Sequence, residues 1–164
     1  MRPTFVLIRG NSGSGKTVLA TALQHHFGYK NCLLLHQDVI RRDVLHADDH
    51  AGTPAVSLLE DLVKYGQQHY QITILEGILR KDVYGEMLQQ LIKRFDKTAL
   101  IYYLDIPFTI AAEHNQMKNE PFAEEKLRCW WREDDYLGGK EQRLHDGDTK
   151  TFCQKIIDDI EKLD

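Results

Sequence analysis

The segment GNSGSGKT at residues 10–17 constrains the fold of this chain more than any other stretch. It follows the short apolar run TFVLI (4–8), and apolar residues at helical spacing begin directly after it. Its spacing fits G-x-x-x-x-G-K-[S/T], in which a loop between a strand and a helix surrounds phosphate oxygens with backbone N–H groups. A Cβ atom at the tight positions would block that approach, which accounts for Gly10, Gly13 and Gly15.

This loop predicts a nucleoside triphosphate site, against the alternative of a Gly/Ser turn with a chance lysine. We expect Lys16 to reach the outer phosphates and the hydroxyl of Thr17 to ligate Mg²⁺, which takes oxygen ligands. ATP is preferred over GTP because the chain lacks a guanine-reading N/T-K-x-D element. The predicted nucleotide-binding residues are Gly10, Asn11, Ser12, Gly13, Ser14, Gly15, Lys16 and Thr17.

Short apolar runs alternate with amphipathic segments along the chain, which predicts a mostly parallel sheet with helices on both faces. The chain is therefore expected to form one α/β domain over residues 1–164. Predicted strands lie at 4–8, 32–36, 72–75, 99–104 and 143–145. Predicted helices lie at 15–27, 38–45, 54–70, 82–95 and 150–163, and two charged helices are expected within 107–137.

Polar residues follow two further strands at the edge where ligands of such sheets bind. Asp38 follows the second strand and is predicted to orient or deprotonate an acceptor hydroxyl, with Lys16 as the other catalytic residue. Arg41 and Arg42, one turn later, would hold an anionic part of the substrate or stabilise charge in transit. The alternative is that Asp38 caps a helix and that both arginines are solvated.

Glu76 and Gly77 end the third strand. Glu76 is predicted to hold Mg²⁺ through water or to bind the acceptor, and the alternative is a strand-end carboxylate paired with a neighbouring base. Gly77 would allow substrate or backbone to approach closely.

Four further segments complete a family pattern: QDVIRRDVL (37–45), ILEGIL (74–79), YYLDIPF (102–108) and WWREDDYL (130–137). With the glycine-rich loop they resemble, over nearly the whole chain, small P-loop kinases related to zeta toxins and chloramphenicol phosphotransferase. The D-x-x-R element of Asp38 and Arg41 is similar to that of zeta toxins and polynucleotide 5′-kinases. The resemblance implies a P-loop NTPase three-layer sandwich with a five-stranded parallel sheet.

The same resemblance implies ATP with Mg²⁺, transfer of the γ-phosphate to a hydroxyl, and Asp38 as the base. It also implies a mobile lid, here at about 107–137. Such lids carry an Arg-His pair and another arginine downstream, whereas this chain has Glu113 before His114 and Met117–Lys118 beyond. Missing arginines would slow catalysis. The remaining candidate lid cations are Lys118, Arg128 and Arg132.

The composition disfavours two classes of partner, extended nucleic acids and membranes. The formal charge is −4 and basic residues occur at most in pairs, which disfavours an extended nucleic-acid track. No apolar run approaches a membrane span, and three widely spaced cysteines suit a reducing cytoplasm. For Trp130, core packing is favoured over base stacking.

These observations lead to an ATP-dependent kinase for a small-molecule hydroxyl, acting as a monomer or homodimer. The alternatives are a nucleic-acid 5′-end kinase and a regulatory module that binds nucleotide with little turnover.

Overall fold

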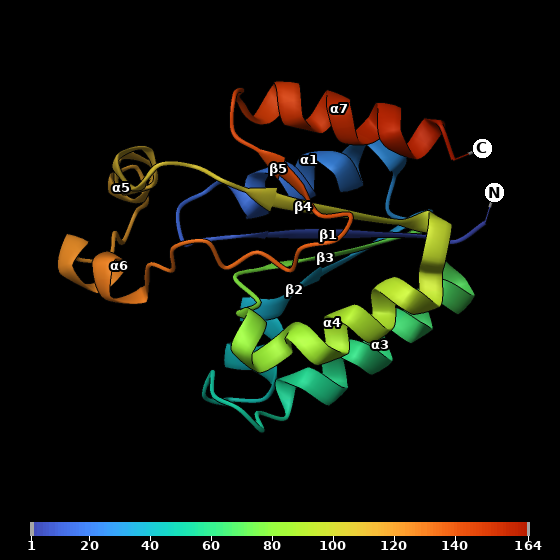
Figure 1. The fold of residues 1–164 in the computed structure, drawn as a ribbon, viewed down its shortest axis with the longest axis horizontal. Helices are drawn as coiled ribbons and strands as arrows, with labels where there is room; N and C mark the ends of the chain where they lie inside the picture. Colours follow the sequence, from blue (N-terminus) through green and yellow to red (C-terminus); the bar gives the residue numbers. More distant parts are fainter. Residues whose placement is uncertain (1, 164) are drawn as a thin grey trace.

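The computed structural model describes residues 2–163, which contain a five-stranded sheet in the order β2-β3-β1-β4-β5 with every pairing parallel (Figure 1). This confirms the predicted α/β class and strand number. The strands are β1 Thr4–Gly10, β2 Cys32–His36, β3 Ile72–Gly77, β4 Ala99–Leu104 and β5 Gln142–Leu144.

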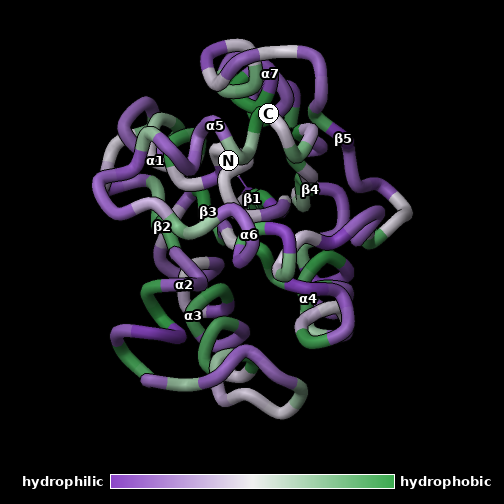
Figure 2. Tube along the Cα trace, turned by 90° about the vertical axis from the view of Figure 1, so that its left-hand side faces the viewer, coloured by the Kyte–Doolittle hydropathy of each residue, from purple (hydrophilic) through white to green (hydrophobic). Residues whose placement is uncertain are grey.

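Helices cover both faces of the sheet, which gives the predicted three layers (Figure 1). Helices α1 Lys16–Phe27 and α7 Thr149–Glu161 lie on one face, and α3 Ala55–His69 and α4 Lys81–Phe95 lie on the other. Helices α5 Phe108–Gln116 and α6 Glu124–Trp130 lie beyond the carboxyl ends of the strands. Seen from that end, α6 and the connections around it are largely hydrophilic (Figure 2).

Strand β1 lies at the centre of the sheet and joins the two halves of the core. Phe5 and Leu7 belong to the cluster under α3 and α4, whereas Val6 and Ile8 belong to the cluster under α1 and α7. Successive side chains of a strand point to opposite faces, and all four are fully buried. The apolar run before the glycine-rich loop therefore holds that loop at the middle of the sheet's edge.

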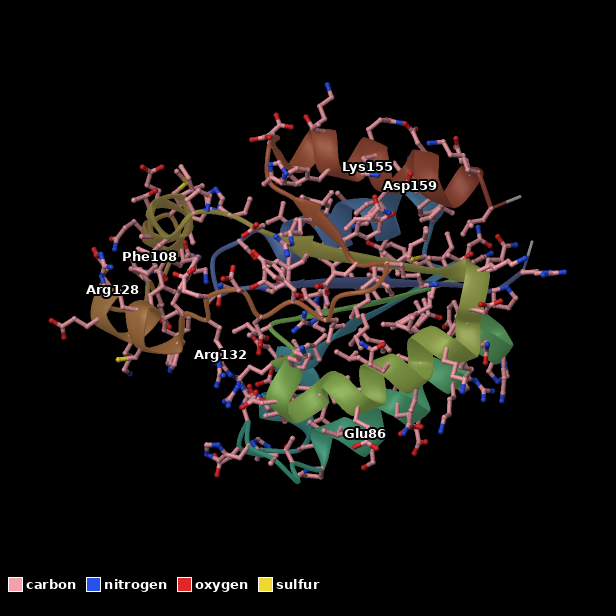
Figure 3. The ribbon with its side chains drawn as sticks, viewed as in Figure 1. Glu86, Phe108, Arg128, Arg132, Lys155 and Asp159 are labelled. Carbon is pink, nitrogen blue, oxygen red and sulfur yellow. The ribbon has the colours of Figure 1, made fainter. Side chains whose placement is uncertain are left out.

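Helix α7 is tied to strand β4 by a polar contact. The hydroxyl of the fully buried Tyr102 donates to Asp159 (2.8 Å), and Lys155 donates to the same carboxylate (2.7 Å), as Figure 3 shows for the two helix residues. Burial opposes ionisation of Asp159, but these hydrogen bonds, together with the charge of Lys155 and a contact with Gln142, lower its pKa. The last helix is thereby fixed over the sheet.

The structure departs from four of the predicted elements. Pairing carries β1 and β3 two residues further, to Gly10 and Gly77. The predicted helix 38–45 divides into α2 Gln37–Val39 and a π-helix at Ile40–Val44. Helix α6 ends at Trp130, so a helix through 137 was wrong. The backbone groups of Arg132 are instead bonded to a side chain of the glycine-rich loop.

Within residues 2–163, no helix is both long and apolar enough to cross a membrane.

Candidate functional site

The glycine-rich loop is shaped by close contacts with the rest of the protein. A Cβ atom on Gly13 would lie 2.6 Å from the carbonyl oxygen of Ala111, and Gly13 has a φ of +80°. A Cβ atom on Gly10 would lie 2.8 Å from Ser14 Oγ and 3.0 Å from the carbonyl oxygen of Leu104. These two glycines are thus required by the protein's own packing, in addition to the predicted approach of phosphate.

Lys16 is buried in this loop. Its ammonium donates to the carbonyl oxygen of Asn11 (2.8 Å) and to Ser14 Oγ (3.4 Å). Burial lowers the pKa of Lys16 to about 8, although Glu76 and Asp38 oppose this shift. A buried cation that is only partly compensated favours an anionic ligand beside it.

Thr17, Glu76 and His36 meet at the carboxyl ends of the central strands. The Thr17 hydroxyl donates to Glu76 Oε1 (3.1 Å), and His36 Nδ1 lies 2.7 Å from the same oxygen. The hydrogen bond with Glu76 raises the pKa of His36. Glu76 thus has the neighbouring base that the alternative interpretation predicted, and it also lies beside the predicted metal ligand Thr17.

The oxygen atoms of Thr17 and Glu76 are suited to Mg²⁺, which accepts one or two protein oxygens together with substrate phosphates and water. No group of three or more His, Cys, Asp or Glu side chains that could hold a metal occurs among the described residues. A metal held here would therefore depend on phosphate oxygens for its remaining ligands.

Two of the cavities at this edge of the sheet lie beside Asp38. The first has a volume of about 370 Å³ and is lined by the glycine-rich loop, Glu76, His114 and Thr149. The second, of about 460 Å³, lies between the 38–50 segment and the 118–132 segment. The residues that line both cavities are Ser12, Asp38, Ile78 and Lys118.

Asp38 therefore lies on the boundary between the two cavities. Its side chain is 52% exposed, and His36 rather than Asp38 occupies the N-cap position of α2. The alternative prediction that Asp38 serves as a helix cap is wrong. Arg41 Nη2 lies 3.8 Å from Asp38 Oδ1, and Arg41 and Arg42 both line the second cavity.

The lid segment places its candidate cations in different surroundings. Lys118 lines both cavities and Arg132 lines the second. Arg128 lines neither: it donates to Glu124 (2.8 Å) and lies 4.2 Å from the ring centre of Phe108, on the side of α6 that faces α5 (Figure 3). His114 Nδ1 lies 2.7 Å from the carbonyl oxygen of Gly13.

Asn11 links the loop to this segment. Its side-chain oxygen accepts from the backbone N–H of Arg132 (2.9 Å), and its side-chain nitrogen donates to the carbonyl oxygen of Arg132 (2.8 Å). Sequence analysis assigned Asn11 only to nucleotide binding. Since the two residues are far apart in the sequence, no local pattern could reveal this connection.

Sequence analysis also missed two arginines. Arg80 lines the second cavity and donates to the carbonyl oxygen of Asp49 (3.2 Å). Arg9 is fully buried at the end of β1 and donates to the carbonyl oxygen of Leu79, to Asp135 and to Glu141. A charged residue at the end of an apolar run gives no signal of such distant partners.

The central strand, the glycine-rich loop and the helix after it define a P-loop protein with a kinase-like α/β fold. Residues 1–103 match the family model for zeta toxin. Since this is more than half of the chain, the chain belongs to the zeta toxin family, as the sequence resemblance predicted.

Curated relatives match a shorter stretch. Uridine kinases from Geobacillus sp. (strain WCH70) and Geobacillus kaustophilus (strain HTA426) are each 42% identical over 45 residues, or 27% of this chain and 21% of each relative. The match thus spans only about a fifth of the length of these relatives.

Solved structures resemble almost the whole chain. A gluconokinase from Sinorhizobium meliloti 1021 aligns with a TM-score of 0.70 at 11% identity, covering 99% of this chain and 94% of that one. Mycobacterium tuberculosis APS kinase CysC, in complex with AMPPNP and APS, aligns with a TM-score of 0.68 at 18% identity over 98% of both chains. The Deinococcus radiodurans tunicamycin resistance protein aligns with a TM-score of 0.66 at 16% identity, covering 97% and 96%. At these identities the likeness shows a shared fold.

Proposed function

We propose that this protein is a kinase that transfers the γ-phosphate of ATP to a hydroxyl group of a small molecule. The observation that carries the proposal is the position of Asp38, which lines both the cavity of the glycine-rich loop and the cavity beside it. A carboxylate at such a boundary can contact an acceptor in one cavity while the phosphate donor lies in the other.

The glycine-rich loop would bind the donor. Backbone N–H groups at the start of α1 and the ammonium of Lys16 would surround the β- and γ-phosphates. Thr17 would ligate Mg²⁺ directly and Glu76 would hold it through water, because the Thr17 hydroxyl oxygen and Glu76 Oε1 lie 3.1 Å apart. Bound Mg²⁺ would neutralise charge that develops on the phosphate oxygens.

Asp38 would act as the base. The acceptor oxygen forms a bond to the γ-phosphorus, the bond from that phosphorus to the bridging oxygen of ADP breaks, and the hydroxyl proton passes to the Asp38 carboxylate. Arg41, one turn later and close to Asp38, would orient this carboxylate. The acceptor would lie in the second cavity.

The test is an assay of ADP release with Mg²⁺·ATP against a panel of sugars, nucleosides and antibiotics. Once an acceptor is found, Asp38→Asn is expected to lower kcat by about 10²-fold or more, since a positioned base contributes about 10²–10⁴-fold. Asp43→Asn is the matched control, because Asp43 is exposed on the adjacent π-helix and lines neither cavity. Equal kcat for the parent and Asp38→Asn would refute the role of Asp38.

One observation favours a second candidate function, a regulatory module that binds nucleotide with little turnover. The described residues that line the first cavity include Lys16 and Lys118 but no arginine. Lysine lacks the planar pair of donors with which arginine stabilises charge on a transferring phosphate. Tight nucleotide binding with slow hydrolysis, unchanged by any acceptor, would support this function over the first.

A further inference from the structure

The second cavity carries positive charge in a chain whose formal charge is −4. Two carboxylates line it, Asp38 and Asp49, and a third, Asp82, is not part of the lining but pairs with two of its arginines. Even when Asp82 is counted, three carboxylates face five cations. The cationic residues that line the cavity are Arg41, Arg42, Arg80, Lys118 and Arg132.

These cations differ in how fully their donors are used by neighbouring carboxylates. Arg80 forms two hydrogen bonds with Asp82 (3.1 and 2.7 Å). The shortest distance between Arg132 and Asp82, from Nη2 to Oδ2, is 3.6 Å, which is too long for a hydrogen bond. Among the described residues, Arg42 forms no ion pair within 4.0 Å. The guanidinium groups of Arg42 and Arg132 therefore retain donors for a ligand.

An aromatic wall adjoins these arginines. Trp130 and Phe122 line the same cavity with their ring centres 5.1 Å apart, and Trp130 is 42% exposed. The prediction that Trp130 packs in the core was therefore wrong. Arg132 follows Trp130 by two residues, and its side chain is labelled below α6 in Figure 3. The cavity thus offers cationic donors and an exposed ring to the same ligand.

We propose that the acceptor is an anionic alcohol, whose phosphate, sulfate or carboxylate group binds Arg42 and Arg132 while its hydroxyl faces Asp38. The proposal rests on the proposed kinase function and adds the charge class of the substrate. Planar guanidinium groups match such oxyanions with paired hydrogen bonds. A cleft lined by one sign of charge also concentrates ligands of the opposite sign.

The experiment measures binding separately from phosphate transfer. The protein is saturated with Mg²⁺·AMPPNP, so that the glycine-rich loop is occupied, and probes are titrated by calorimetry and tryptophan fluorescence. The probes are matched pairs: ribose 5-phosphate and ribose, uridine 5′-monophosphate and uridine, and gluconate and glucose. We expect anionic members to bind at least tenfold more tightly than their neutral partners.

Variants identify the residues involved. The double variant Arg42→Gln/Arg132→Gln is expected to remove the preference, because each lost charged hydrogen bond weakens binding by about tenfold or more. Asp82→Asn is expected to act in the opposite direction, because it frees donors on Arg80 and Arg132. Arg94→Gln is the control: Arg94 lies on α4 and donates to Gln67, away from both cavities.

The outcomes separate this proposal from the proposed function. If no anionic probe binds better than its neutral partner, or if the double variant keeps the preference, the anionic acceptor is refuted, even when a neutral alcohol is phosphorylated. If anions bind through Arg42 and Arg132 but no probe stimulates ADP release from Mg²⁺·ATP, the anion site stands and the kinase function fails.

Discussion

At the scale of single residues, the charged side chains of the candidate site are hydrogen-bonded to other groups of the protein. The ammonium of Lys16 is bonded to the carbonyl oxygen of Asn11, and Glu76 is bonded to Thr17 and His36. Each of these groups is close to the position where a phosphate or Mg²⁺ would bind. Binding is therefore expected to exchange internal hydrogen bonds for ligand contacts, with little change in the fold.

The first prediction concerns Lys16→Ala. A ligand at 100 times its Kd stabilises a protein by about 2.7 kcal/mol, which for this chain length is roughly 5–10 °C in Tm. We expect Mg²⁺·ATP to produce such a shift in the parent and almost none in the variant. Without nucleotide, the variant should be about as stable as the parent, because relief of the desolvation of a partly compensated buried charge offsets the two hydrogen bonds that are lost.

Thermal denaturation with and without Mg²⁺·ATP measures both effects. Lys93→Ala provides the control, since Lys93 is exposed on α4. A full nucleotide shift in the Lys16 variant would mean that the glycine-rich loop does not bind the triphosphate.

At the scale of elements, local patterns predicted most of the fold. The apolar runs that became β1 to β4 are continuous in the sequence, and the periodicity of α3, α4 and α7 matches one apolar face on each helix. Segment 131–137 was mispredicted because its path depends on Asn11 and Arg9, which lie more than 100 residues away. The charge pattern alone could not distinguish a helix from an irregular segment whose position is set by distant side chains.

Two helical glycines provide a matched test of packing between elements. A Cβ atom on Gly66 of α3 would overlap Thr73 of β3, whose side chain is buried. On Gly85 of α4, the nearest atom would be Cγ of the flexible Lys81, at 3.3 Å. We expect Gly66→Ala to destabilise the protein by about 1–3 kcal/mol through overpacking. Gly85→Ala should stabilise it by up to about 1 kcal/mol through helix propensity.

Urea denaturation of both variants measures the difference. Equal and positive changes in the free energy of unfolding would show that α3 lies further from β3 than the structure indicates.

At the scale of the whole molecule, Arg9 connects parts that the sequence separates widely. From the end of β1 it donates to the carbonyl oxygen of Leu79 after β3 and to Asp135 and Glu141 before β5. The two ion pairs measure 2.9 and 3.1 Å, and the arginine is fully buried. This network holds the 131–141 segment against the strand that carries the glycine-rich loop.

The last prediction is that Arg9→Ala destabilises the whole folded structure. Removing one partner of a buried ion pair leaves uncompensated charge and typically costs about 3–5 kcal/mol. Here the carboxylates of Asp135 and Glu141 would lose their cation at once. Because both core clusters share β1, we expect one cooperative transition shifted to lower urea concentration. Arg143→Ala, which removes an exposed arginine stacked on Tyr136, should cost only about 0.5–1 kcal/mol.

Arg9→Met separates charge from packing, since it keeps an apolar side chain of comparable length at the end of β1. We expect Arg9→Met to be nearly as unstable as Arg9→Ala, because both variants leave the same carboxylates unpaired. Hydrogen exchange should show whether protection is lost across the sheet or only within 131–141. If protection is lost only within 131–141 and the urea midpoint of unfolding is unchanged, Arg9 positions that segment without stabilising the rest of the protein.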